Sequence, residues 1–208
     1  MKLTGESKIL LGILAATAVI ILTAIAYVNK PAPLQKPISR DELIPPGSFT
    51  TGNASAAAWL VEFSDFQCPA CRAFAPTVVE LVKTYPDKLL FIYRHYPLSQ
   101  HQYAKSAAMV AEAAGLQGKF WEMSTLLFEN QNRFATNPWG ALASELKLNR
   151  KQFDVDLSSQ TLKTKIDRDE QTAIRLRLPG TPTFFLNGIR LAITSPLELK
   201  KAVEEVIR

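Results

Sequence analysis

Apolar and polar positions divide the chain into an apolar start, a proline-rich middle and a long mixed remainder. The first part runs from Ile9 to Val28 without a charge, and these roughly 20 apolar residues are enough to cross a bilayer as a helix. The remainder alternates short apolar runs with helical periodicity. We therefore predict a cytoplasmic tail at 1–8, a transmembrane anchor at 9–28, a tether at 29–45 and a folded domain at 46–208.

The apolar run also has a second interpretation, as a signal peptide. Ala24-Ile25-Ala26 is a plausible A-x-A cleavage site, although the run is longer than the ~7–15-residue core of a typical signal peptide. This length favours the uncleaved anchor, and the short N-terminal tail favours an N-inside orientation. In both cases the rest of the chain is exported, to the outer face of the cell membrane or, if it is cleaved after Ala26, to the periplasm or beyond.

The proline-rich stretch carries prolines at positions 31, 33, 37, 45 and 46. Prolines at this density oppose a helix and disfavour a strand, because each one lacks a backbone donor and has a fixed φ. We therefore expect residues 29–45 to form a semi-extended tether.

The folded domain opens with a strand, a helix and a second strand. Trp59 to Phe63 is almost continuously apolar, which is typical of a strand covered on both faces. Helical spacing then extends from Pro69 to Tyr85, with Pro76 expected to kink the helix, and the β-prone run KLLFIYRHY follows. Short connections between these elements predict a parallel βαβ unit within an α/β fold.

Alanine, leucine, glutamate and lysine dominate from about 99 to 177, which predicts a block of several helices. Strand character returns in TPTFFLNGIRLAI, where Asn187-Gly188 is a strong hairpin turn. Ser195 and Pro196 then provide the cap and first position of a C-terminal helix.

Composition narrows the class of protein. The 208 residues are 47% hydrophobic and 21% charged, as in a globular protein. The net charge of +5 comes with no basic stripe interleaved with aromatic residues, so nucleic acid is not an expected partner. The two cysteines are too few to staple a miniature fold.

Cys68 and Cys71 are the two cysteines, and their position indicates chemistry. Cys68 directly precedes Pro69 at the predicted helix start, where free backbone N–H groups and the helix dipole favour a thiolate. Cys71 lies one turn further along on the same side, so it can attack a mixed disulfide formed at Cys68. The spacing therefore predicts dithiol–disulfide exchange.

The ordered motifs VEFSDFQCPACRAFAP, FIYRHYPL, KFWEMSTLLFENQ and PGTPTFFLNG resemble the DsbA-like branch of the thioredoxin superfamily. The resemblance covers roughly Leu43 to Arg208. It implies a thioredoxin-like fold with a central mixed sheet and a helical insertion at about 99–177. It also implies that Cys68 is the exposed nucleophile and that Cys71 resolves the mixed disulfide.

The resemblance assigns roles to further residues. Thr181-Pro182 matches a loop whose cis-proline faces the disulfide and binds peptide substrate, the alternative being an ordinary trans turn. Pro69 and Ala70 complete the expected substrate-binding surface and influence the redox potential. Glu62 matches a buried acid that accepts the proton of Cys71, and its alternative is a solvated position at the sheet edge.

A zinc site is the competing chemical interpretation. The two cysteines with His95 and His101 supply four zinc-type ligands. The long gap before His95 and the helix-starting Pro69 argue against it, so we expect neither a metal nor a cofactor. Asp65 is expected only to end its strand, and Arg94 and His95 to be surface or packing residues at a strand end.

We therefore expect an enzyme that donates disulfides to reduced exported proteins. A reductase or isomerase on the same fold is the alternative, as is a non-catalytic peptide-binding or chaperone module. The short tether lacks the residues of a dimerisation domain, which favours a monomer. The family resemblance further implies re-oxidation by a membrane partner of the DsbB or VKOR kind.

Overall fold

The computed structural model describes residues 5–28 and 36–208, and within the first stretch it describes the side chains of residues 13–25. These residues belong to two separate units, Met1–Gln35 and Lys36–Arg208. Helix α1, Gly5–Val28, makes up the first unit as far as it is described. Among the described residues, no helix combines the length and apolarity needed to span a membrane. The anchor at 9–28 stays a prediction, and positions 1–4 and 29–35 lie outside the described residues.

The second unit is built on a five-stranded mixed sheet with the order β1-β3-β2-β4-β5. The strands are β1 Phe49–Gly52, β2 Ala58–Ser64, β3 Leu89–His95, β4 Thr183–Leu186 and β5 Ile189–Arg190. β2 and β3 are parallel and are joined by helix α3, Pro69–Thr84, which confirms the predicted βαβ unit. The other neighbouring pairs are antiparallel, and Asn187 and Gly188 form the predicted hairpin turn with positive φ angles of 49° and 84°.

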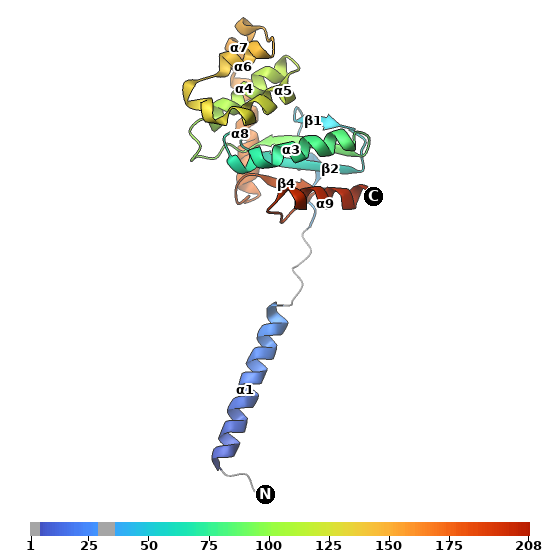
Figure 1. Ribbon diagram of the computed structural model, residues 1–208, viewed down its shortest axis with the longest axis vertical. Coiled ribbons are helices and arrows are strands. Elements are labelled where there is room, and N and C mark those ends of the chain that lie inside the picture. Colours follow the sequence, from blue (N-terminus) through green and yellow to red (C-terminus); the bar gives the residue numbers. More distant parts are fainter. Residues whose placement is uncertain (1–4, 29–35) are drawn as a thin grey trace. The chain divides into compact units, whose positions relative to one another are not determined.

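Helices cover both faces of the sheet, as Figure 1 shows. α3 packs with the C-terminal helix α9, Pro196–Ile207, on one face, while α8, Gln160–Arg175, crosses the other. Alternation along β2 directs Leu60 into the first layer and Phe63 into the second. Both faces of β2 are therefore buried, as its continuous apolar run predicts.

The predicted helical insertion is present between β3 and β4. It comprises α4 Ala104–Leu116, α5 Phe120–Glu129, the 3₁₀ helix Gln131–Thr136, α6 Trp139–Glu145, α7 Arg150–Asp156 and α8. The ring of Phe120 stacks on Phe49 of β1 with their centroids 3.8 Å apart. Gly115 lies against the same Phe49 ring and leaves no room for a Cβ atom, so α4 approaches the sheet closely at this point.

The segment before the sheet differs from the prediction. The compact unit begins at Lys36 rather than at position 46, and Arg40–Leu43 forms a short helix, α2, within the predicted tether. The Ser39 side chain accepts a hydrogen bond from the Glu42 N–H and so caps α2, and Leu43 is fully buried. The edge strand β1 is also additional to the predicted strands.

Candidate functional site

The two cysteines occupy the predicted positions at the start of α3. Cys68 is the N-cap residue, with φ −73° and ψ 121°, and Pro69 is the first helical residue. Both thiols are free. Cys71 is fully buried, and Cys68 is only 6% exposed rather than openly exposed as expected. Cys68 instead lies in the wall of a cavity of about 660 Å³.

The loop before β4 faces Cys68. The Thr181–Pro182 peptide bond is cis, as expected, and the Cys68 thiol donates a 3.4 Å hydrogen bond to the Thr181 carbonyl oxygen. The Thr181 hydroxyl is buried and has no geometric hydrogen-bond partner among the described residues. The fold therefore places this loop next to the Cys68 sulfur atom, although the two are more than 100 residues apart in the sequence.

The surroundings of the two thiols place the negative charge on Cys68. A hydrogen bond from the Cys71 thiol lowers the pKa of Cys68 to about 5, opposing the effect of burial, with further help from Thr181 and the N–H groups of Ala70 and Cys71. The pKa of Cys71 is raised by burial and by the hydrogen bond that it gives to Cys68. A thiolate is the nucleophilic form, so the opposite pKa shifts favour Cys68 over Cys71 as the nucleophile.

Glu62 is buried at 3% exposure in the middle of the sheet, which excludes the solvated edge position. Burial raises the pKa of its carboxyl to about 8, although a 2.7 Å hydrogen bond from the Ser64 hydroxyl acts in the opposite direction. Ser64 also lowers the pKa of Cys71 through a hydrogen bond. Ser64 thus connects Glu62 with the buried thiol. The sequence signal for Ser64 was its position two residues after Glu62, which places both side chains on the same face of β2.

Asp65 does more than end its strand. Its carboxylate is buried and lies 2.7 Å from Nδ1 of His101, with Oδ2 as the nearer oxygen. His101 lines the same cavity as Cys68. The full lining consists of Cys68, residues 96–101, Glu170, Ile174 and residues 179–181.

Comparison with known proteins places this site in a family. A family model described as thioredoxin matches residues 45–205, which is most of the chain. The chain belongs to the thioredoxin family. Its matches among solved structures include a thioredoxin-like oxidoreductase and a thiol-disulfide exchange protein.

A thioredoxin-like oxidoreductase from Silicibacter pomeroyi is 26% identical, with a TM-score of 0.69, and the match covers 81% of this chain and 97% of that one. The thiol-disulfide exchange protein alpha-DsbA2 from Wolbachia pipientis shares the fold at 18% identity and a TM-score of 0.71, over 80% of this chain and 90% of that one. Na⁺/H⁺ antiporter NhaA 1 of Mycolicibacterium vanbaalenii is 37% identical over 142 residues, 67% of this chain. The chain spans only 23% of the length of that relative.

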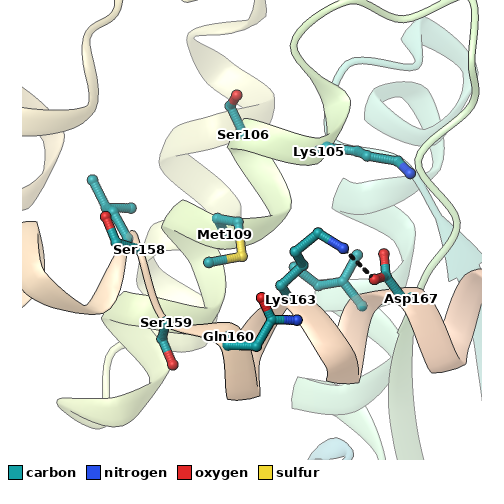
Figure 2. A pocket seen from close by; sticks show the side chains of 10 residues that line it. Lys105, Ser106, Met109, Ser158, Ser159, Gln160, Lys163 and Asp167 are labelled. Carbon is teal, nitrogen blue, oxygen red and sulfur yellow. Dashed lines mark hydrogen bonds and ion pairs between the residues drawn. The ribbon is translucent and has the colours of Figure 1, made fainter.

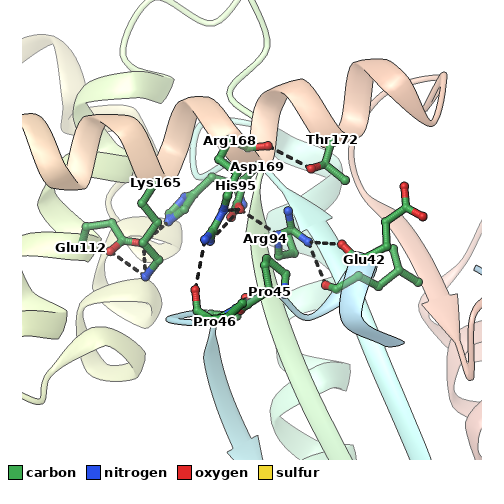
Figure 3. Close-up of polar contacts among 12 residues, drawn as sticks. Glu42, Pro45, Pro46, Arg94, His95, Glu112, Lys165, Arg168, Asp169 and Thr172 are labelled. Carbon is green, nitrogen blue, oxygen red and sulfur yellow. Dashed lines mark hydrogen bonds and ion pairs between the residues drawn. The ribbon is translucent and has the colours of Figure 1, made fainter. Parts of the chain in front are cut away.

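Arg94 and His95 are buried, so the surface alternative for them is wrong. Figure 3 shows their polar contacts. Nε of Arg94 lies 2.9 Å from Asp169, and its Nη1 donates a 2.8 Å hydrogen bond to the Leu43 carbonyl oxygen. His95 Nε2 lies 2.9 Å from a carboxylate oxygen of Glu112. β3 is buried along its whole length, so charged side chains on it require partners from the flanking helices.

Both histidines of the zinc interpretation have carboxylate partners. His95 pairs with Glu112 and His101 pairs with Asp65. Across the described part of the chain, no group of three or more potential metal ligands comes together. The side chains therefore give no support to a zinc site.

A second cavity, of about 280 Å³, lies between α4 and α8 (Figure 2). Its lysines are already engaged: Lys163 lies 2.6 Å from Asp167, and Lys105 lies 2.9 Å from Glu170. No cysteine lines this cavity. The chemistry of the site is therefore concentrated at the larger cavity beside Cys68.

Proposed function

We propose that the protein donates disulfides to reduced exported proteins, with Cys68 as the nucleophile and Cys71 as the resolving cysteine. The observation that supports this direction is the opposite displacement of the two thiol pKa values, down to about 5 for Cys68 and upward for Cys71. A stabilised Cys68 thiolate favours the reduced enzyme. The disulfide form is correspondingly oxidising.

In the proposed reaction, a client thiolate attacks Cys68 of the Cys68–Cys71 disulfide. The bond between the two cysteines breaks, its electron pair leaves on Cys71, and a client–Cys68 mixed disulfide forms. A second client thiolate then attacks the client sulfur and releases Cys68. A thiol of low pKa is a good leaving group, so the environment of Cys68 favours this release.

Glu62 is proposed to exchange a proton with Cys71. Its carboxyl, with a pKa of about 8, holds a proton at neutral pH and can supply it to the departing Cys71 sulfur. Ser64 hydrogen-bonds to Glu62 at 2.7 Å and is the bridging hydroxyl in this scheme. In the reverse direction Glu62 accepts the proton when Cys71 attacks.

The proposed client-binding surface consists of Pro69, Ala70 and the Thr181-Pro182 loop. Pro69 and Ala70 are exposed beside Cys68, and the Thr181 carbonyl oxygen accepts a 3.4 Å hydrogen bond from the Cys68 thiol. An extended peptide placed between them would present its cysteine to Cys68. We expect no resident cofactor in this reaction.

For location, we propose that residues 9–28 anchor the protein and hold residues 46–208 outside the cytoplasm, with cleavage after Ala26 as the alternative. The composition of the run supports this, because it is uncharged from Ile9 to Val28. A membrane re-oxidant of the DsbB or VKOR kind would regenerate the disulfide. Membrane fractionation and labelling of Cys68 in intact cells with an impermeant maleimide test this placement.

The deciding experiment is the reduction potential of the Cys68–Cys71 pair, measured in the full-length chain against glutathione. A value of about −120 to −180 mV identifies a donor of disulfides, and one near about −270 mV identifies a reductase. Cys68→Ser should abolish exchange while the fold persists. If this variant kept full function, the chain would be a peptide-binding module, and correction of scrambled disulfides would instead favour an isomerase.

A further inference from the structure

We propose that His101, oriented by Asp65, removes the proton from the client thiol that enters the Cys68 cavity. This inference rests on the proposed exchange at Cys68. It assigns a further proton-handling group to the reaction, in the lining of the Cys68 cavity, to which Glu62 does not belong.

Asp65 is built as an anchor for the imidazole. Its side chain is 0% exposed and follows β2 directly. Oδ1 accepts a 2.7 Å hydrogen bond from the Gln67 N–H, and Oδ2 accepts one of 2.9 Å from the Leu98 N–H. The third contact, at 2.7 Å, is with Nδ1 of His101. The two backbone N–H groups directed at this buried carboxyl match an ionised carboxylate, which only accepts hydrogen bonds.

This contact fixes the state of the ring. A carboxylate acceptor requires the hydrogen on Nδ1, so the lone pair of the neutral imidazole lies on Nε2. Within the described part of the chain, Nε2 of His101 has no hydrogen-bond partner, and 20% of the side chain is exposed. The His101 ring and Cys68 line the same cavity. The residue with the free lone pair therefore borders the space that the client thiol would enter. An orienting acid, an imidazole and a reactive thiol are the parts from which enzymes assemble activated nucleophiles.

The other histidine shows why this position is distinctive. His95 is 2% exposed, and its Nε2 already contacts Glu112 at 2.9 Å. It therefore has no free lone pair directed at a cavity. Besides Cys68, the other ionisable side chains on the lining are Tyr96 and Glu170, and Glu170 forms an ion pair with Lys105.

The reaction needs a base at this position. Cys68 needs no base to ionise at neutral pH, since its pKa is about 5. A client cysteine has an ordinary thiol pKa of about 8.5, and most of it is protonated at neutral pH. In the proposed step the client S–H gives its proton to Nε2 of His101, and the client sulfur bonds to Cys68. The Cys68–Cys71 bond breaks and its electron pair leaves on Cys71, which takes the proton of Glu62.

The test compares two thiols that differ in whether they need a base. N-acetylcysteine is mostly protonated at pH 7, whereas thionitrobenzoate is already an anion. Single-turnover reduction of the oxidised full-length protein is measured with each thiol. His101→Gln should slow the reaction with N-acetylcysteine by about 10- to 100-fold, within or just below the usual range for general-base catalysis. It should leave the rate with thionitrobenzoate within about twofold of the unmodified protein.

The matched control is Gln102→Ala, which alters the exposed neighbour of His101 outside the cavity lining and should leave both rates unchanged. Equal slowing of both thiols by His101→Gln would show a structural role and overturn the assignment, as would an unchanged rate with N-acetylcysteine. His101→Asn provides the same comparison if the glutamine variant does not fold. If the unmodified protein and Cys68→Ser were equally inert toward thionitrobenzoate, the proposed exchange itself would fail, which is a different outcome.

Discussion

The hydrogen bond between the two thiols leads to a quantitative prediction for Cys71→Ala. That hydrogen bond is the largest contribution to the lowered pKa of Cys68, which stands at about 5. A hydrogen bond to a charged group contributes about 1.5–3 kcal/mol, and about 1.4 kcal/mol corresponds to one pKa unit. Cys71→Ala should therefore raise the pKa of Cys68 to about 6–7. Cys71→Ser retains a hydroxyl donor and should leave the pKa of Cys68 closer to its value in the unmodified protein.

The assay is a pH titration of thiolate absorbance at 240 nm on the reduced variants, paired with the rate of alkylation by iodoacetamide. Each variant retains Cys68 as its single cysteine, so both signals report on one thiol. Equal midpoints near 5 in both variants would refute the reasoning. The thiolate would then be held by the helix N-terminus and Thr181, and the contact between the thiols would be incidental.

Three further predictions concern the free energy of unfolding, measured by urea denaturation of the reduced protein. Glu62→Gln should stabilise the folded protein by about 3 kcal/mol at pH 7 and not at pH 4. The pKa of Glu62 is raised from 4.5 to about 8 by folding, so this carboxyl destabilises the folded state increasingly as the pH rises through that interval. The free energy of unfolding of the unmodified protein should rise by about 1.4 kcal/mol per pH unit between pH 5 and 9, relative to that of Cys68→Ser. In this interval the Cys68 thiol is ionised in the folded protein, because its pKa is lowered, but still protonated in the unfolded chain. Asp169→Asn leaves Arg94 buried without its charged partner and should cost about 3–5 kcal/mol, whereas Asp167→Asn, in a partly exposed pair, should cost at most about 1 kcal/mol. A cost for Asp169→Asn no larger than that of Asp167→Asn would contradict the buried-pair argument.

The βαβ core was predictable because its strands are buried on both faces, so their hydrophobic runs are continuous. β1 was missed because FTTG is a short edge strand that alternates between half-buried and exposed, and its order comes from pairing with β3. α2 was missed because the surrounding prolines dominated the interpretation of its segment. Ser39 followed three residues later by Glu42 is the sequence signature of a helix start, and it was the signal available there.

For the site as well, local features of the sequence were predictable and contacts between distant residues were not. The placement of Cys68 and Cys71 follows from their spacing at a helix start, which is a local property of the sequence. The contact of Asp65 with His101 joins residues 36 positions apart, and nothing in the spacing reveals it. Arg94 was misjudged because buried charges are costly, and its partner Asp169 comes from a helix more than 70 residues away.

The buried carboxyl and the lowered thiol pKa have opposite effects on stability, and only the effect of the thiol disappears when the disulfide forms, which supports the proposed direction of exchange. In the reduced protein at pH 7, the Cys68 thiolate contributes about 3 kcal/mol, because its pKa of about 5 lies two units below that pH. The cost of Glu62 at the same pH is of similar size and opposite sign. Forming the disulfide removes the thiolate but leaves Glu62 buried, so the oxidised protein keeps the cost without the compensation. A reduced state favoured by about 3 kcal/mol raises the reduction potential by about 60 mV over that of an unperturbed pair, toward a donor of disulfides.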